Sequence, residues 1–230
     1  MSNAADLNKE PEEVASMFDG VAKRYDLLND LLSLGRTKAW RKVVTTIIEP
    51  KPGMKILDIA AGTGSSSRPL ADKGASVTCL DFSEGMLAAG RKRNPDLTFI
   101  QGDALKLPFT DQSFDVTTIS FGLRNTHDAG AALAEAHRVT KDGGKIVIAE
   151  FSHPTNALFR YIYMRYLMRA LPVIAKRVAS NPQAYIYLAE SIQAWPDQKA
   201  LASIMEKSGW GNIAWQDLSF GIVAVHIGQK

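Results

Sequence analysis

Short apolar, mostly β-branched runs recur along the middle of the chain, about 20 residues apart. The stretches between them, such as 65–74 and 131–144, have helical patterns that end at glycine. Strands that alternate with helices at this spacing predict a parallel, doubly wound sheet. The five predicted strands are 55–60, 76–81, 97–101, 114–121 and 145–151.

The end of the chain has a different pattern. Two strand-like runs, 212–219 and 221–230, are separated by almost nothing, which predicts an antiparallel hairpin. We therefore expect an α/β fold with a seven-stranded, mostly parallel sheet whose C-terminal strand is antiparallel.

Helical patterns flank this sheet. Residues 12–49 are predicted to form N-terminal helices, and residues 155–208 a helical insertion between the fifth and sixth strands. A single domain is expected over 12–230. Residues 1–11 are expected to be a flexible tail, in which Ser2-Asn3-Ala4 resembles the remnant of an expression tag.

Composition narrows the class of protein. A hydrophobic fraction of 46% with 22% charged residues is typical of a globular chain and excludes collagen and coiled coil. The lone Cys79 excludes a disulfide framework, and no Cys/His cluster has zinc-like spacing, so we expect no metal site and a reducing, cytoplasmic location. No apolar run approaches the roughly 20 residues that span a bilayer.

The candidate ligand site follows from the sheet, because ligands of open α/β sheets bind outside the carboxyl ends of the strands. The first strand leads into Gly62-Thr63-Gly64, where glycines let the backbone approach a ligand. The third glycine of the dinucleotide fingerprint is replaced by Ser67, which weakens the case for NAD and suits a nucleoside without pyrophosphate.

Two carboxylates follow the next two strands. Asp81 ends the second strand, where an acid accepts ribose hydroxyl hydrogens, and Asp103-Ala104 follows the third, where a carboxylate can accept the adenine amino group. Together with the glycine turn they favour S-adenosylmethionine as the cofactor. The competing interpretation is that Asp81 and Asp103 only cap the helices that follow them.

Four longer stretches carry a family resemblance: YDLLNDLLSLGRTKAW, ISFGLRN, RVTKDGGKIVIAEFS and YLAESIQAWPDQ. They resemble the C-methyltransferases of ubiquinone and menaquinone biosynthesis. The resemblance implies a class I methyltransferase (Rossmann-like) fold, with cofactor contacts from Thr63, Asp81, Asp103, Ala104 and Ser120. MFDGVA (17–22) and LMRALP (167–172) are most like the menaquinone branch, which implies C-methylation of demethylmenaquinol; methylation of a benzoquinol is the alternative.

ISFGLRN ends a predicted strand with a permanent charge, Arg124. Its side chain either reaches solvent or faces a bound group. Methylation of a quinol carbon calls for a cation beside the developing oxyanion, and Arg124 is our candidate, with Asn125 donating to a second oxygen. The alternative is a structural arginine paired with an acid such as Asp26 or Asp128.

The general base is left open. His127 and His153 follow the fourth and fifth predicted strands, and an ordinary histidine pKa of about 6.5 suits the task. A water relayed through Arg124 and Asn125 is the alternative, whereas His137 and His226 are expected to pack. Tyr25 is either a lid residue or a core tyrosine.

The insertion is basic and aromatic. No acid lies between Glu150 and Glu190. This pattern fits a lid that covers a polyprenyl tail and touches anionic headgroups at the inner face of the membrane, and it fits equally an ordinary helix packed on the sheet or on a second subunit. The basic residues are Arg160, Arg165, Arg169, Lys176 and Arg177.

Two other classes of function remain as alternatives. A nucleic-acid methyltransferase would use the basic segment on phosphates, but the chain lacks an Asn-Pro-Pro-Tyr-type motif after the fourth strand, and we expect no nucleic-acid partner. The other alternative is a cofactor-binding protein without turnover. The predicted partners are therefore a polyprenylated quinol and, transiently, a membrane surface, with a homodimer left open.

Overall fold

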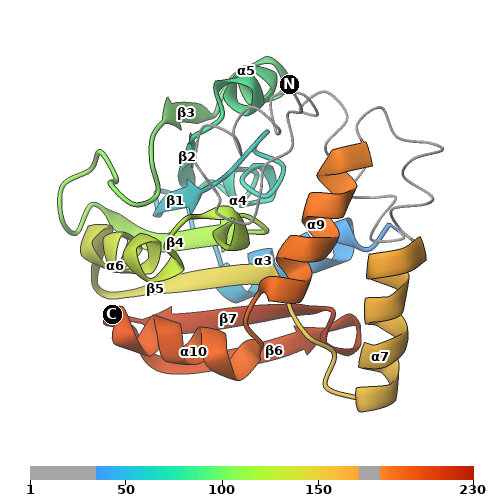
Figure 1. Cartoon of the computed structure of the whole chain (residues 1–230). Coiled ribbons are helices and arrows are strands. Elements are labelled where there is room, and N and C mark those ends of the chain that lie inside the picture. The colour runs from blue at the N-terminus through green and yellow to red at the C-terminus, as the bar shows by residue number, and fades with distance from the viewer. Residues whose placement is uncertain (1–34, 171–181) are drawn as a thin grey trace.

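The sheet has seven strands, as the hydrophobic pattern predicts. The computed structural model describes residues 35–170 and 182–230 (Figure 1). The strand order is β3-β2-β1-β4-β5-β7-β6. The first five strands run parallel, and β7 is antiparallel to both β5 and β6, which confirms the predicted hairpin. The strands are β1 Lys55–Ile59, β2 Ser76–Asp81, β3 Thr98–Gln101, β4 Phe114–Ser120, β5 Thr140–Phe151, β6 Gly211–Leu218 and β7 Val223–Gln229.

Helices cover both faces of the sheet and stand beside its end (Figure 1). Three short helical turns, η1 Leu123–Asn125, the π-helical η2 Tyr166–Ala170 and η3 Ser219–Gly221, complete the described elements. The α-helices are α3 Thr37–Ile48, α4 Arg68–Ala71, α5 Glu84–Arg93, α6 Ala129–Val139, α7 Ala157–Arg165, α9 Pro182–Ala194 and α10 Gln198–Lys207.

Polar caps decide where four of these helices begin. Ser83 at the start of α5 accepts a hydrogen bond from the Met86 N–H, and an Asp or Asn oxygen plays the same part at the other three. Each cap satisfies one of the backbone donors that a helix N-terminus leaves unpaired. The other caps are Asp128 for α6, Asn156 for α7 and Asp197 for α10.

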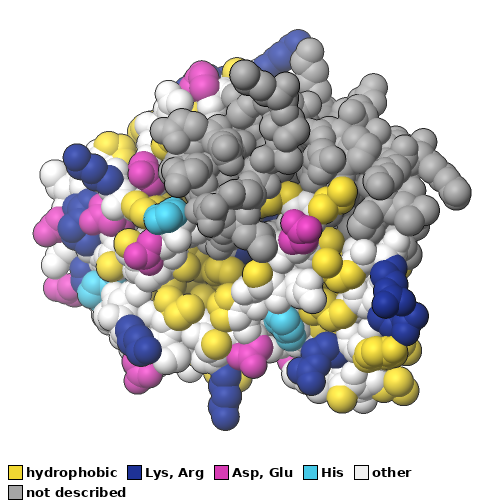
Figure 2. Space-filling view, in the orientation of Figure 1, with side chains coloured by type: hydrophobic (Ala, Val, Ile, Leu, Met, Phe, Trp, Pro, Cys, Tyr) yellow, Lys and Arg dark blue, Asp and Glu magenta, His cyan; other side chains and the backbone are white. Residues whose placement is uncertain are grey.

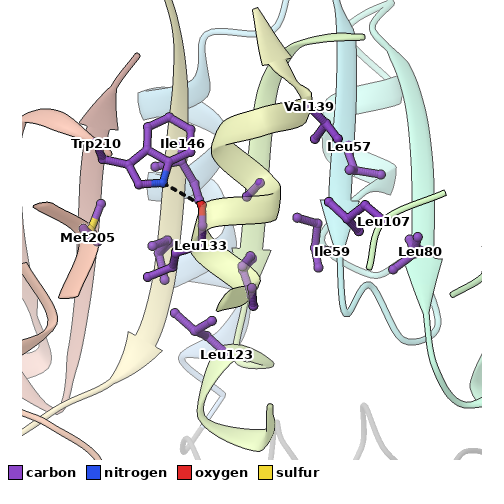
Figure 3. Close-up of a cluster of buried hydrophobic side chains, with 14 of the residues drawn as sticks. Leu57, Ile59, Leu80, Leu107, Leu123, Leu133, Val139, Ile146, Met205 and Trp210 are labelled. Atoms are coloured by element: carbon purple, nitrogen blue, oxygen red, sulfur yellow. Dashed lines mark hydrogen bonds between the residues drawn. The ribbon is translucent and has the colours of Figure 1, made fainter. Parts of the chain in front are cut away.

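The larger core lies between the sheet and the pair α6 and α10. Figure 3 shows Leu133 of α6 and Met205 of α10 meeting Ile146 of β5. Trp210 joins this cluster, and its indole N–H donates to the Leu133 carbonyl oxygen at 3.0 Å. Although α10 falls within the predicted insertion, it therefore packs as part of the sheet's own covering layer.

The opposite face of the sheet is covered by α3 and α4. Val44 and Ile48 of α3 pack against Ile56, Val147 and other strand residues. Because successive side chains of a strand point to opposite faces, Asp58 lies on the same side as Ile56, under α4. A buried carboxylate therefore stands directly before the glycine turn.

The helices α7 and α9 stand apart from this core, together beside the sheet (Figure 1). They share a small cluster in which Leu167, Ala189 and Ile192 are buried and Phe151 and Tyr163 are partly buried. Within the described residues, no helix is long and apolar enough to cross a membrane. The predicted N-terminal helices are described only from α3 onward, so residues 12–34 and the segment 171–181 of the insertion lie outside the described residues.

Candidate cofactor and substrate site

The strand order reverses between β1 and β4, and the turns after these two strands touch each other. Both turns contain a non-glycine residue in the left-handed region, Ala60 with φ of 54° and Phe121 with φ of 60°. A Cβ on Gly122 would lie 2.4 Å from the Cβ of Ala60, so only glycine fits there. Backbone strain of this kind concentrates at functional sites, and this is the edge where a doubly wound sheet binds ligands.

The turn after β1 needs glycine at two positions, Gly62 and Gly64. Gly62 and Gly64 have φ of 55° and 75°, and a Cβ on Gly64 would lie 2.9 Å from Phe99 Cζ. Thr63 stands between them, is buried, and its carbonyl oxygen accepts from the Asn94 amide at 3.3 Å. The two glycines are thus required by backbone conformation and, at position 64, by packing.

Asp81 joins this turn to the end of β2. Its Oδ2 accepts a hydrogen bond from the Gly62 N–H at 2.7 Å, and its Oδ1 accepts from the Ser83 N–H at 2.9 Å. Since the Ser83 side chain caps α5, the interpretation of Asp81 as the cap of that helix is wrong. The carboxylate instead orders the turn, and because each carboxylate oxygen can accept more than one hydrogen bond, ribose hydroxyls can bond to it as well.

Asp103 and Ala104 follow β3 in a turn. The Asp103 carboxylate accepts from the Leu105 N–H at 2.9 Å, and no helix of the described chain begins there, so helix capping is wrong for this residue too. The Gly102 N–H donates to the Asp81 carbonyl oxygen at 3.0 Å. The ends of β2 and β3 therefore lie side by side, which puts Asp81 and Asp103 on the same edge of the sheet.

Ser120 is the last residue of β4. Its Oγ is buried and, within the described chain, has no hydrogen-bond partner. A buried hydroxyl without a partner costs stability unless something bonds to it. The glycine turn, the Asp81 carboxylate and this hydroxyl fit S-adenosylmethionine, whose polar groups would satisfy them.

Arg124 is buried with 3% of its surface exposed, so the interpretation that it escapes to solvent is wrong. Its Nη1 lies 2.8 Å from Oε1 of Glu150, which is itself 1% exposed at the end of β5. The same nitrogen donates to the Phe121 carbonyl oxygen at 2.5 Å, and the Arg124 backbone N–H donates to Glu150 Oε2 at 3.2 Å. The acid partner among the described residues is thus Glu150, whereas Asp128 caps α6 and Asp26 lies outside the described residues.

At least one donor of this buried guanidinium is left over within the described chain. The Arg124 Nε–H has no hydrogen-bond partner among the described residues, although the atom is inaccessible to solvent. The guanidinium carbon lies 5.1 Å from the centre of the Phe151 ring. A desolvated cation with an unused donor is suited to an anion or to an oxygen that becomes one.

Aromatic rings line the same place. Phe121 and Phe151 have ring centres 5.3 Å apart, and the Trp40 ring lies 5.8 Å from the first and 6.3 Å from the second. Trp40 comes from α3, 80 or more positions before the two phenylalanines. A flat apolar ring with an oxygen substituent can pack against these aromatic rings and place its oxygen beside the Arg124 cation.

Asn125 receives a partner that sequence analysis missed. The hydroxyl of Tyr187, on α9, donates to Asn125 Oδ1 at 3.3 Å, and Tyr187 is buried. Because the amide oxygen is engaged, the Asn125 NH₂ group is the end that can donate. Tyr187 opens the stretch YLAESIQAWPDQ, which was the signal available for it.

The tyrosine and histidines near the edge differ in what they can do. Burial raises the pKa of the Tyr163 hydroxyl, although the nearby Arg124 charge opposes the shift, so Tyr163 stays protonated at neutral pH and does not serve as a general base. The His153 ring nitrogen Nε2 bonds to the Trp195 carbonyl oxygen at 2.8 Å, and His127 is exposed. The general base remains open, and Tyr25 lies outside the described residues.

The other two histidines pack as expected. His137 stands edge-on to Trp210, and His226 bonds through Nε2 to the Gln198 carbonyl oxygen. Burial lowers the pKa of both imidazoles, which keeps them neutral. Within the described ranges, no group of His, Cys, Asp and Glu has the arrangement of a metal site.

Sequence analysis also missed a polar cluster beneath the glycine turn. Asp58 Oδ2 accepts from Ser67 Oγ at 2.5 Å, and the thiol of Cys79 lies 3.1 Å from the same hydroxyl. Burial is the main cause that raises the pKa of Asp58 from 3.8 to about 7, with Asp81 adding to the shift. Ser67, which breaks the dinucleotide fingerprint, thus has a structural task of its own. The signal available in the sequence for this cluster was a charged residue, Asp58, inside the apolar run KILDIA.

Comparison with known proteins matches the sequence to one family and the fold to solved structures. The sequence model of the ubiE/COQ5 methyltransferase family matches residues 5–230. Demethylmenaquinone methyltransferases of Paenarthrobacter aurescens and Streptomyces avermitilis are each 58% identical, covering 99% and 98% of this chain and 90% and 98% of their own. A solved S-adenosylmethionine-dependent methyltransferase of Aquifex aeolicus has a TM-score of 0.58 at 15% identity, over 82% of this chain and 88% of its own.

Proposed function

The chain belongs to the ubiE/COQ5 methyltransferase family, and from this premise we propose that it methylates a ring carbon of demethylmenaquinol, giving menaquinol. The observation that best supports this substrate is the match at 58% identity, over nearly the whole chain, to proteins named demethylmenaquinone methyltransferase. The chain is an S-adenosylmethionine-dependent methyltransferase of the class I fold.

We propose that the cofactor is held along the carboxyl ends of β1 to β4. The backbone of Gly62-Thr63-Gly64 lets the ligand approach closely, and Asp81 accepts from the ribose hydroxyls. Asp103 accepts from the adenine amino group beside Ala104, and Ser120 supplies its unused hydroxyl. When bound, S-adenosylmethionine supplies a methyl group already activated on a sulfonium.

The residues of the chain have the harder task, since a quinol ring carbon is a weak nucleophile. Loss of the hydroxyl proton makes the adjacent carbon electron-rich, and the Arg124 guanidinium stabilises the resulting oxyanion with its unused Nε–H. Asn125 donates its NH₂ group to a second oxygen. Burial of these groups strengthens both contacts because water does not compete for the oxyanion.

The Arg124–Glu150 pair is preorganised for this step. Glu150 accepts from the Arg124 side chain, from the Arg124 backbone and from the Phe151 N–H, so the guanidinium is anchored before substrate arrives. The aromatic wall of Trp40, Phe121 and Phe151 packs against the quinol ring in this proposal. The chain works at the inner, cytoplasmic face of the membrane, where a polyprenylated quinol is embedded.

Transfer of labelled methyl from the cofactor tests the function. Purified protein is incubated with reduced demethylmenaquinone, oxidised demethylmenaquinone, a demethylated benzoquinol of ubiquinone type, and nucleic acid. Label is expected in the reduced naphthoquinol alone. Label chiefly in the benzoquinol or in nucleic acid would replace the substrate, and cofactor binding without transfer to any of them would refute an enzymatic role.

A further inference from the structure

The outer side of α7, together with Tyr166 at the start of η2, is apolar although nothing in the described chain covers it. Leu158, Tyr161, Ile162 and Tyr166 follow one another at helical spacing, and they are 70%, 58%, 56% and 41% exposed. The inner side is apolar as well, because Tyr163 and Leu167 pack toward α9. A surface helix ordinarily turns polar residues to solvent, so this outer stripe needs an explanation.

The turn between β6 and β7 presents another aromatic ring at the same place. Phe220 is 81% exposed, and the three residues Ser219, Phe220 and Gly221 all have left-handed backbone, with φ of 51°, 60° and 86°. The turn is held in this strained shape, because the Trp40 indole N–H donates to Ser219 Oγ at 3.0 Å. Phe220 meets Phe159 of α7 edge to face, with ring centres 5.7 Å apart.

The charged residues of α7 are all basic. Arg160 and Arg165 of α7 are exposed, and the sequence has no acid between Glu150 and Glu190. The Arg165 guanidinium lies over the ring of Tyr161, 5.4 Å from its centre. Figure 2 shows hydrophobic and basic side chains adjoining where α7 lies in Figure 1. Aromatic and aliphatic residues interleaved with arginine are typical of surfaces that lie on anionic headgroups.

We propose that the outer stripe of α7 and Phe220 form one docking face for an anionic lipid bilayer. The inference rests on the proposed function, because a polyprenylated quinol resides in such a bilayer. The face is close to the site, because Phe151, which lies under the Arg124 guanidinium, belongs to the same cluster as Tyr163 of α7 and Leu167 of η2. Docking there brings the substrate ring to the aromatic wall while its tail stays in lipid.

Vesicle sedimentation without any quinone tests the face independently of catalysis. Wild-type protein is expected to bind phosphatidylcholine vesicles that contain phosphatidylglycerol, to bind pure phosphatidylcholine weakly, and to lose affinity as salt is added. Leu158→Ser with Phe220→Ser is expected to lower the affinity at least about ten-fold. Arg160→Gln with Arg165→Gln is expected to lower it by about ten- to thirty-fold at low salt.

A matched control removes two exposed lysines at the other end of the sheet. Lys73→Gln with Lys92→Gln changes the net charge equally and is expected to leave vesicle binding within about two-fold, since neither residue lies on the face. Equal loss in this control would overturn the assignment. Binding that ignores salt and lipid charge would overturn it too, as would Phe220→Ser dissociating a dimer without changing vesicle binding.

Turnover separates this inference from the proposed function. With demethylmenaquinol embedded in anionic vesicles, the Leu158 and Phe220 variant is expected to lose rate in proportion to its binding, whereas a short-chain, water-soluble demethylated naphthoquinol is methylated at the wild-type rate. Failure of wild-type protein on both substrates would refute the proposed function and leave the vesicle result standing.

Discussion

Replacing Arg124 by alanine perturbs the most enclosed charge pair among the described residues. The substitution removes the 2.8 Å contact to Glu150, the bond to the Phe121 carbonyl oxygen and the contact with the Phe151 ring. The Glu150 carboxylate stays behind, 1% exposed, and its remaining partners among the described residues are backbone N–H groups. Breaking a buried pair in this way costs about 3–5 kcal/mol.

That loss converts into measurable quantities. For a chain of this length, each kcal/mol lowers the midpoint of thermal unfolding by about 2–4 °C, so a fall of roughly 6–20 °C is expected. If Arg124 also stabilises the oxyanion, kcat falls by about 10²–10³, which is the effect of removing one such donor elsewhere. Cofactor affinity, measured by calorimetry on the folded protein, is expected to stay nearly unchanged because Arg124 is not among the proposed cofactor contacts.

A double substitution separates the two effects. Arg124→Met with Glu150→Gln removes both charges together and keeps similar volume, so stability is expected to recover most of the loss. Turnover is not expected to recover, since the donor is still missing. If the double variant turns over within about three-fold of wild type, the oxyanion reasoning is refuted and Arg124 is structural.

Arg138 supplies the control for this experiment. It pairs with Asp111 and Glu135 at 2.8 Å, away from the carboxyl ends of the strands, and its side chain is partly exposed. Arg138→Met removes an arginine with acid partners from outside the site. Partly exposed pairs are worth at most about 1 kcal/mol each, and kcat is expected to stay at the wild-type value.

Three further substitutions test the cofactor edge. Asp81→Asn is expected to raise the dissociation constant for the cofactor by about 10–100-fold in calorimetry, because it weakens charge-assisted bonds to the glycine turn and to the ribose. Gly122→Ala is expected to destabilise the protein by about 1–3 kcal/mol in denaturant and to weaken cofactor binding, because its Cβ would lie 2.4 Å from that of Ala60. Burial raises the pKa of Asp58 from 3.8 to about 7, so the stability of the wild-type protein is expected to fall as pH rises between these values. Asp58→Asn is expected to flatten that fall.

The sign of the pH effect follows from proton binding. Above its unfolded pKa of 3.8 the folded protein keeps the Asp58 proton that the unfolded chain releases, so Asp58 costs stability as pH rises and the cost is complete near pH 7. About three pH units at 1.36 kcal/mol each put the difference on the order of 4 kcal/mol. Parallel stability curves for wild type and Asp58→Asn over this range would contradict the raised pKa of Asp58.

Gly211→Ala is the control for Gly122→Ala, because the atom nearest to a Cβ on Gly211 would be 3.7 Å away.

Much of the fold could be read from the residues because buried parallel strands leave an unambiguous pattern. The runs at 55–60 and 76–81 are mostly apolar or β-branched, and each became a strand within one residue of its expected bounds. The cofactor edge was predictable for the same reason: once strands are placed, whatever follows their carboxyl ends lies together. Asp81 therefore lies beside the glycine turn although 19 positions separate it from Gly62.

The charges could not be paired in the same way. Asp128 is four positions from Arg124 and looked like a partner, but a helix N-terminus needs that carboxylate, and the Asp128 side chain caps α6. Glu150 is 26 positions away and becomes the partner because β4 and β5 run in register, with Ser120 opposite Ala149. Sequence distance says nothing about such a meeting, since it depends on which strands become neighbours.

Hydrophobic periodicity and turn chemistry by themselves determined the seven strands, the hairpin at the end and the glycine turn at the switch point, because these depend on local patterns. Only the tertiary structure decided the state of the polar groups. Burial raises the pKa of Asp58 to about 7. Strand pairing gives Arg124 its counter-charge, and the packing of α9 brings Tyr187 to Asn125. Each of these properties depends on how far a polar group is removed from water and on its distance from a partner, and the folded chain alone sets these two quantities.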